Sequence, residues 1–252
     1  FDLTILKLIL VSGLYPQIAI SDDFNYCKSM NEQFFHTKAK PYVSMHPMSG
    51  FAANYQVLNV PECDVIPKTG LYKSKQPLSS RHQIICYLSI LETTKPYLMN
   101  AIRMPAAQTL LLFAQQIDCN VTFSRIICDS WLCLDFPFPE AGQILILRAA
   151  KLRKRWNDLV DKKLSESEIE NVKKSREFER LERDLASFMN SEISYTIKRL
   201  LPADLKTLYK GTRDEDYEAL MLQPNPFSES FSCVLNDVKG GVFVTENVTY
   251  GW

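Results

Sequence analysis

Apolar residues recur with two different periods at the start of the chain. Leucines repeat at helical spacing from Leu3 to Leu14, and Gly13 and Pro16 end that segment, which predicts a short helix. The next segment, Gln17–Ser21, alternates with a period of two and predicts a strand. A helix followed directly by a strand is therefore expected to open the fold.

The stretch 34–51 predicts a strand that ends in a fixed turn. Tyr42–Met45 carries side chains that suit a half-buried pleated surface. Pro47 cannot donate to a sheet and disfavours helical backbone at His46, so the strand ends there. We interpret His46, Pro47 and Ser49 as a structural turn motif.

More short strands follow before residue 118. His82–Leu91 and Leu98–Arg103 predict strands, and Pro105–Gln116 predicts a helix with proline at its start, where a lost donor is harmless. The proline- and lysine-containing segment 59–82 predicts a long exposed loop. Several short strands bracketed by helices predict a small, partly closed β-barrel of the oligonucleotide-binding (OB) type over residues 1–118.

The pattern changes in residues 119–252. Segments 121–127 and 130–136 predict a hairpin, and apolar residues repeat every three or four positions over 145–159 and again over 178–188. These stripes predict two long helices, followed by an extended tail. The whole chain is therefore predicted to be α+β: an OB-like barrel with flanking helices, then a mixed α/β domain containing a long αα-hairpin.

Composition narrows the class of protein. Lys plus Arg and Asp plus Glu both total 29, so no bulk charge attracts nucleic acid or membrane. Seven cysteines without a CxxC pair favour reduced thiols in an intracellular protein, cytoplasmic or nuclear. No apolar run of about 18 residues predicts a membrane span, so we expect no membrane partner. The opening segment lacks Met and a basic region, and we interpret the chain as a piece of a larger protein.

No catalytic constellation can be assembled from the sequence. The phosphate-binding loop G-x-x-x-x-G-K-[ST] and the motifs G-x-G-x-x-G, H-E-x-x-H and G-x-S-x-G do not occur. The three histidines, His36, His46 and His82, do not stand beside a cysteine pair that would suggest zinc. We therefore expect no catalytic residue, metal site or cofactor in this sequence.

Two loops carry the mixture of cations and aromatic rings that grips single-stranded nucleic acid. Proteins of that kind neutralise the phosphates with Lys and Arg and stack the bases on aromatic faces. One such loop is at Phe34 and Phe35 with the residues after them, and the other precedes a strand. The candidate RNA-binding residues are Lys38, Lys40, Tyr42, Thr94, Lys95 and Tyr97. The alternative, equally compatible with composition, is that the lysines protect a sheet edge while the aromatics belong to the core.

The densest basic run lies on the first long helical pattern. Arg148, Lys151 and Arg155 share one side of that helix and form a candidate partner surface. The interpretation we favour is a solvated face whose charges pair with Asp and Glu of the next helix.

Taken in order, these motifs resemble the C-terminal auxiliary region of the DEAH-box (DEAH/RHA) RNA helicases. That family carries an I-H-P-S-S turn, here Met45 to Ser49, and a later L-T-T-K-x-Y ending, here Leu91 to Tyr97. The sequence departs from the pattern at Met48 and Glu92 and in its longer loop at 59–81. The later segments RWNDLVDKKL, SYTIKRLLPADLKTLY and KGGVFVTENVTY resemble the branch of the family associated with nonsense-mediated mRNA decay.

The resemblance implies a function without catalysis in this chain. It implies an accessory region of an ATP-dependent helicase that contacts single-stranded RNA and modulates the helicase core, with ATP and Mg²⁺ held by that core. Its expected partners are RNA, the core and mRNA-surveillance proteins. The alternative is a docking module for surveillance factors with little RNA binding of its own, and salt dependence separates the two, since phosphate contacts weaken steeply with ionic strength.

Overall fold

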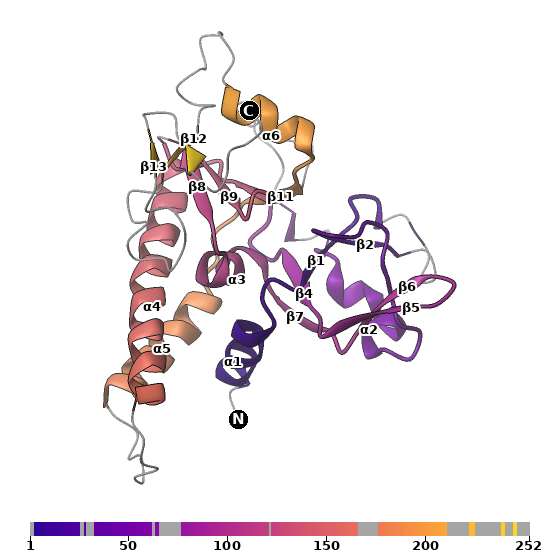
Figure 1. Ribbon diagram of the computed structural model, residues 1–252, viewed down its shortest axis with the longest axis horizontal. Coiled ribbons are helices and arrows are strands. Elements are labelled where there is room, and N and C mark those ends of the chain that lie inside the picture. The colour runs from indigo at the N-terminus through magenta and orange to yellow at the C-terminus, as the bar shows by residue number, and fades with distance from the viewer. Residues whose placement is uncertain are drawn as a thin grey trace.

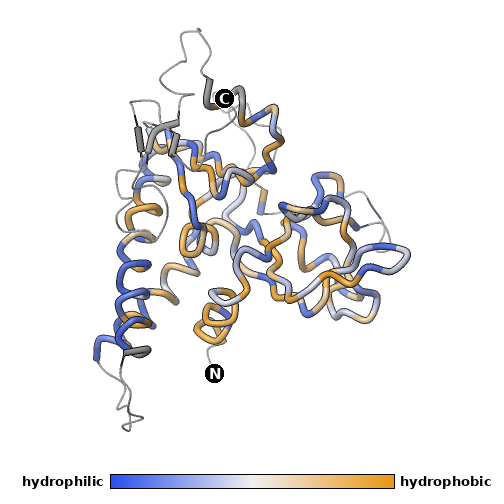
Figure 2. The backbone as a smooth tube through the Cα atoms, viewed as in Figure 1, coloured by the Kyte–Doolittle hydropathy of each residue, from blue (hydrophilic) through white to orange (hydrophobic). Residues whose placement is uncertain are grey.

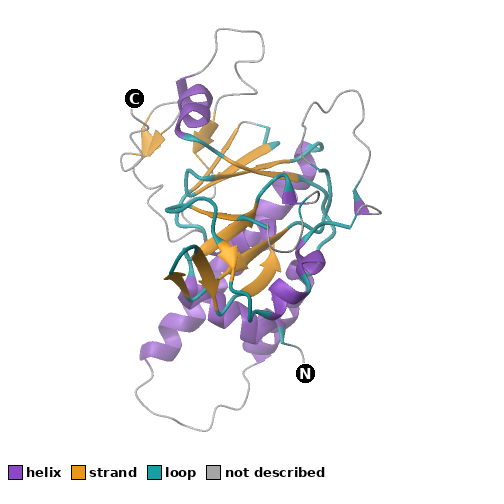
Figure 3. Ribbon diagram, turned by 90° about the vertical axis from the view of Figure 1, so that its right-hand side faces the viewer, coloured by secondary structure: helices purple, strands orange, loops and turns teal. Residues whose placement is uncertain are grey.

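A computed structural model gives the fold. It describes residues 3–25, 28, 33–61, 64–65, 77–120, 122–165, 176–210, 222–224, 238–239 and 244–245. The small sheets of the N-terminal half lie at one side of the molecule, the two long helices α4 and α5 at the other, and α1 and α3 between them (Figure 1). Figure 3 views the molecule from the side of the small sheets.

The N-terminal half contains two small sheets that enclose a core. The first has the order β2-β1-β4-β7 and the second the order β3-β6-β5. The elements are α1 (Thr4–Leu14), β1 (Ile18–Ser21), β2 (Phe35–Thr37), β3 (Ser44–Met45), α2 (Gly50–Ala53), η3 (Tyr55–Leu58), β4 (Gln83–Cys86), β5 (Ser89–Glu92), β6 (Pro96–Met99), β7 (Ile102–Pro105) and α3 (Ala106–Phe113). The predicted first helix and first strand are confirmed.

The strands form separate sheets and do not close into a barrel, which corrects the predicted barrel while leaving the OB type of fold in place. Two predicted strands are each broken in two. Leu98–Arg103 divides into β6 and β7 at Asn100, whose φ is 51°. Asn tolerates this left-handed region better than most residues, and its use here bends the chain from one sheet to the other. The predicted strand His82–Leu91 likewise divides into β4 and β5.

A five-stranded antiparallel sheet follows, with the order β11-β10-β9-β8-β12. The predicted hairpin is present as β9 and β10. The sequence does not predict β8, because its residues, Ile117–Asn120, alternate apolar and polar over only two periods. The strands are β8 (Ile117–Asn120), β9 (Arg125–Cys128), β10 (Leu132–Asp135), β11 (Thr196–Arg199) and β12 (Leu222–Pro224). The boundary predicted at residue 118 falls within β8.

Two helices pack on this sheet and on each other. They are α4 (Pro139–Ser165) and α5 (Arg176–Met189), and Figure 2 shows polar and apolar turns alternating along α4. Arg148 of α4 contacts Ser187 of α5, and Arg155 contacts Asp184. Residue numbers therefore increase along α4 in the direction in which they decrease along α5, so the two helices are antiparallel. Their apolar stripes face the protein interior, as the periodicity predicts.

The larger hydrophobic core joins both halves of the chain. Leu8 of α1 and Leu110 of α3 pack in the same cluster as Ile126 of β9, Leu145 of α4 and Phe188 of α5. A smaller core, between the two N-terminal sheets, contains Phe35, Val43 and Leu98 among others. The remaining described elements are α6 (Pro202–Lys210), β13 (Val238–Lys239) and β14 (Val244–Thr245). Much of the predicted extended tail, including residues 211–221, lies outside the described residues.

Candidate nucleic-acid interface

The structure brings together the His-Pro-x-Ser turn and the Thr-Lys-Pro-Tyr segment. β3 and β6 pair in parallel, with Ser44 opposite Tyr97 and Met45 opposite Leu98. The amide of His46 extends this ladder and donates to the Leu98 carbonyl at 3.4 Å. The His-Pro-x-Ser turn and the Thr-Lys-Pro-Tyr segment, about 50 residues apart in sequence, are therefore neighbours in space.

The His-Pro-x-Ser turn places the short helix α2. Ser49 is the N-cap of α2, and its hydroxyl accepts a hydrogen bond from the amide of Phe51 at 3.3 Å. Nδ1 of His46 accepts from the amide of Met48 at 3.2 Å, which closes the turn. The His46 ring also lies edge-on to Tyr97, with centroids 5.7 Å apart. These residues act through the shape of the turn, as the structural turn motif requires.

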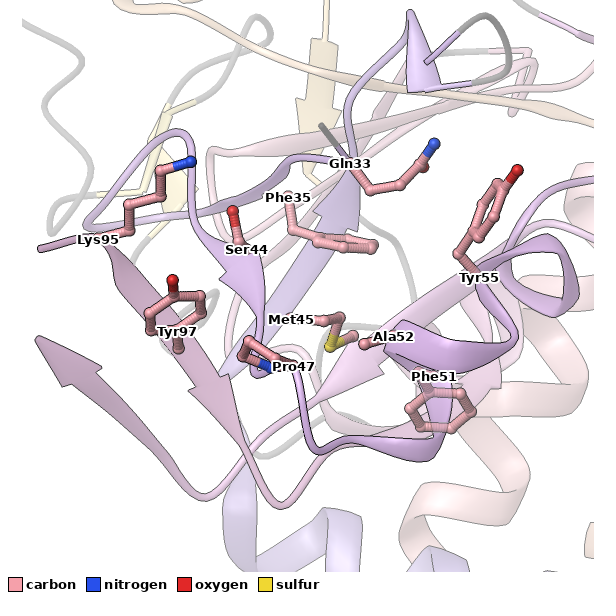
Figure 4. Close-up of a pocket in the computed structure, with 10 residues that line it drawn as sticks. All are labelled: Gln33, Phe35, Ser44, Met45, Pro47, Phe51, Ala52, Tyr55, Lys95 and Tyr97. Carbon is pink, nitrogen blue, oxygen red and sulfur yellow. The ribbon is translucent and has the colours of Figure 1, made fainter. Parts of the chain in front are cut away.

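A pocket of about 250 Å³ opens between the turn, α2, η3 and β6. In Figure 4, Lys95 and Tyr97 lie across this pocket from Gln33 and Tyr55. The lining includes three further residues that the sequence analysis did not propose as contacts: Ser44, Met45 and Phe51. Gln33 and Tyr55 were also missed, because their own sequence surroundings carry no signal. Gln33 precedes β2 and Tyr55 begins η3, so only the tertiary fold brings them to the pocket.

The pocket combines aromatic side chains with one cation. Tyr55, Tyr97 and Phe51 supply ring surface, Gln33 and Ser44 supply amide and hydroxyl groups, and Lys95 is the charged group among the described residues that line it. Its volume lies just below the 300–1,000 Å³ range typical of sites for drug-sized ligands. Rings beside a cation are the groups with which proteins stack bases and neutralise phosphate. The pocket is therefore chemically suited to one nucleobase and its phosphate.

Lys38 and Lys40 have partners within the protein. Nζ of Lys38 donates to the backbone carbonyl of Asp129 at 2.9 Å, which ties the loop to the turn between β9 and β10. Lys40 forms an ion pair with Glu92 of β5. Thr94 is exposed at the tip of the neighbouring loop. Both lysines thus hold loops together, Lys38 as an exposed and Lys40 as a partly exposed residue.

The aromatic residues of the first loop divide into two groups. Phe35 is 1% exposed and belongs to the smaller core, so the expectation that it lies on an exposed edge is wrong. Tyr42 is 58% exposed. It does not belong to the predicted strand Tyr42–Met45, because its φ of 56° is incompatible with a strand and β3 begins at Ser44.

The basic face of α4 is largely used within the molecule. Arg155 forms an ion pair of 2.5 Å with Asp184 of α5, and the guanidinium of Arg148 lies over the Phe188 ring at 5.6 Å. Lys151 is exposed. The contacts of Arg148 and Arg155 agree with the interpretation we favoured, in which this face pairs with the next helix, and they leave Lys151 as the accessible member of the candidate partner surface.

The buried titratable groups serve the fold. Burial lowers the pKa of His82 to about 4, although its Nε2 contacts the carbonyl oxygens of Pro77 and Tyr195 at 3.0 and 2.9 Å. Burial raises the pKa of the Asp22 carboxyl, but hydrogen bonds from Lys28 and His36 outweigh it and bring that pKa below its ordinary value. Within the described ranges, no three His, Cys, Asp or Glu residues converge to hold a metal. None of the described helices combines the length and apolar character needed to cross a membrane.

Comparison with known proteins agrees with this geometry. Residues 6–117 match the family described as "Oligonucleotide/oligosaccharide-binding (OB)-fold". The chain is 35% identical over 257 residues to the human protein named "Probable ATP-dependent RNA helicase DHX34" and 33% identical over 260 residues to the mouse protein of the same name. Each match covers 99% of this chain and 22% of the relative, so the chain spans about a fifth of those proteins. Residues 6–117 thus match the OB-fold family model, and the resemblance of the chain to the C-terminal region of a DEAH-box RNA helicase is confirmed.

Proposed function

We propose that this chain is an accessory region of an ATP-dependent DEAH-box RNA helicase and that its OB-fold part contacts single-stranded RNA. The observation that carries the proposal is the pocket formed where β3 and β6 pair. Lys95 and Tyr97 come from one of the two motifs that resemble the helicase family, and Pro47 comes from the other. The pocket therefore lies where both motifs meet, and its rings and ammonium group match the chemistry of a base and a phosphate.

The wider setting is part of the same proposal. By the resemblance of its later segments to the branch of the family associated with nonsense-mediated mRNA decay, the chain would act in mRNA surveillance, with the helicase core and surveillance proteins as partners. ATP and Mg²⁺ would be held by the core, outside residues 1–252. Within this chain, RNA binding would modulate the core by holding a strand close to it, which requires no catalytic residue here.

A docking module is the second candidate. It is favoured by the zero formal charge of the chain, since dedicated nucleic-acid binders are usually basic. It is also favoured by the internal contacts of Lys38 and Lys40, which reduce the number of free cations beside the pocket. In that case the exposed Lys151 on α4 would belong to a protein-binding surface.

Fluorescence anisotropy with a labelled single-stranded RNA of roughly 12 nucleotides, within the site sizes of OB folds, tests the proposal. Wild-type protein should bind, and its affinity should fall as salt rises. Lys95→Gln should weaken binding several-fold and make the slope of log K against log salt shallower by about 0.7, the value for one phosphate contact with a single strand. Lys162→Gln is the matched control, because Lys162 is also exposed but lies near the far end of α4 (Figure 1).

The same titration decides between the candidates. RNA lies at the pocket if binding depends on salt, is weakened by Lys95→Gln and is unchanged by Lys162→Gln. If wild-type protein does not bind even at low salt, the RNA proposal fails and the docking module stands. If both variants bind as well as wild type, RNA lies elsewhere and the pocket assignment is wrong.

A further inference from the structure

Tyr42 combines exposure with an unusual backbone conformation. Its side chain is 58% exposed, and its φ of 56° places it in the left-handed region, which costs an L-residue about 1–2 kcal/mol. Large aromatic residues rarely occupy that region, and such outliers gather at functional sites. The burial of Tyr42 does not compensate for the strain, because most of its ring faces solvent.

Neighbouring rings hold Tyr42 in one orientation. Its ring lies edge-on to Phe34, with centroids 5.8 Å apart and planes at 89°, and edge-on to His36 at 5.1 Å and 71°. Its amide also faces Nδ1 of His36 at 3.4 Å. These contacts restrict the exposed Tyr42 ring before any ligand binds, so binding costs less side-chain conformational entropy.

Two cations contact the two rings that pack against Tyr42, and one of these cations comes from outside the OB-fold match. Nζ of Lys28 lies 4.9 Å from the Phe34 centroid. Nη1 of Arg199 in β11 lies 3.0 Å from His36 Nδ1, the same nitrogen that faces the Tyr42 amide. The Tyr42 amide and Arg199 both face Nδ1 of His36, and the Asp22 carboxylate lies 2.8 Å from Nε2, so contacts at both ring nitrogens fix the position of the His36 ring.

The local charge favours an anion. Lys28 and Arg199 supply two positive charges, and Asp22, which pairs with Lys28 at 2.9 Å, supplies one negative charge. Arg199 is only partly buried, so its remaining N–H groups can reach a phosphate. Tyr42 is two residues from Ser44 of the pocket, at most roughly 7 Å along an extended chain, so the two features border each other.

We propose that Tyr42 is a second stacking platform for single-stranded RNA, with Arg199 neutralising the adjoining phosphate. This inference rests on the proposed RNA-binding function and deepens it. The pocket takes one base, Tyr42 takes a neighbouring base, and the strand then passes from the OB-fold onto β11. The RNA surface thus includes a residue of the C-terminal region, which the OB-fold match at 6–117 does not cover.

Two substitutions at Tyr42 distinguish the contribution of its ring to RNA binding from the effect of its left-handed backbone conformation. Tyr42→Gly removes the ring and suits the left-handed conformation, because glycine adopts positive φ without strain. Tyr42→Phe keeps the stacking face and removes the hydroxyl. Against the same 12-nucleotide RNA we expect Tyr42→Gly to weaken binding at least about fivefold, the effect of losing one stacked base. Tyr42→Phe should bind like wild type, and the Tm of both variants should stay within about 4 °C of wild type.

Arg199→Gln tests the phosphate contact. Glutamine retains an N–H donor for His36 but carries no charge, so the salt slope should become shallower by about 0.7. If Tyr42→Gly and Arg199→Gln bind like wild type while Lys95→Gln binds weakly, the platform is refuted and the pocket stands. If wild-type protein binds no RNA, both proposals fall. If Tyr42→Gly is weak and Tyr42→Phe is normal, with the shallower slope for Arg199→Gln, the platform is established.

Discussion

Gly142, on the first turns of α4, lies against the backbone of a neighbouring turn. A Cβ added there would lie 2.2 Å from the carbonyl oxygen of Phe123 and 3.2 and 3.3 Å from two ring carbons of Phe136. Real Cβ atoms do not approach an oxygen that closely, and the oxygen belongs to the backbone, so no side-chain rotation can relieve the overlap. Gly142→Ala therefore requires α4 to move away from the turn.

The size of the effect follows from two opposed terms. Alanine in a helix interior is favoured over glycine by about 1 kcal/mol. Overpacking of a filled site typically costs about 1–3 kcal/mol and sometimes more, and a 2.2 Å approach to a carbonyl oxygen belongs at the upper end of that range. We expect a net loss of roughly 2 kcal/mol in the free energy of unfolding.

Gly13 offers a matched control within the same chain. It also lies in a helix, α1, but a Cβ there would meet nothing within 4 Å. Gly13→Ala should leave stability unchanged or raise it by up to about 1 kcal/mol. The two substitutions are chemically identical, so a difference in sign isolates the packing of Gly142.

Urea denaturation followed by circular dichroism measures both changes. The midpoint of Gly142→Ala should fall with little change in the m-value, because the amount of surface exposed on unfolding stays similar. Equal or higher stability for Gly142→Ala would refute the close approach of α4 to the turn at Phe123. It would also remove the reason for glycine at that position.

Three further predictions concern buried polar groups. His82 has a pKa of about 4 when folded and 6.5 when unfolded, so the unfolded state binds its proton more readily. The free energy of unfolding should therefore be highest above pH 6.5 and fall by about 3 kcal/mol as the pH drops towards 4. His82→Gln should flatten this pH dependence, measured by thermal melting at a series of pH values. Burial raises the pKa of Cys86 and of Cys119 to about 12, so mass spectrometry should find neither thiol alkylated by iodoacetamide at pH 8 until urea unfolds the protein. Tyr195→Phe leaves the Ala107 amide without the phenolic oxygen that accepts from it at 2.9 Å and should lower the free energy of unfolding by about 1–3 kcal/mol, measured by urea denaturation.

Helical periodicity carried most of what the sequence could predict of the fold. The stripes that predict α1, α4 and α5 depend only on neighbours three and four residues away, and such local spacing decides which face is buried. Strand ends were harder to predict. Asn100 and Tyr42 adopt positive φ although neither is a glycine, the residue that usually signals it, so one predicted strand became two and another became shorter.

The candidate site was predictable only in part for a related reason. Lys95 and Tyr97 belong to a recognisable motif, whereas Gln33 and Tyr55, from before β2 and from η3, reach the pocket through the tertiary fold, which is not a local property of the sequence. For Arg153 the sequence predicted an exposed side chain that the structure shows to be buried. It stands in a basic run that predicts a solvated face, yet it is 4% exposed and donates to the Ala114 carbonyl at 2.8 Å at the end of α3.

The turn between β9 and β10 ties segments from both halves of the chain to a single residue. The Asp129 carboxylate accepts from the amides of Gln115 and Gln116, each at 2.9 Å, and from the Tyr15 hydroxyl, while its carbonyl accepts from Lys38. A deletion that ends the chain near residue 118 removes this residue together with part of the larger core. Loss of RNA binding in such a truncated chain would then report misfolding of the OB-fold as much as loss of a separate module, so point variants are the sounder tool for assigning function to either half.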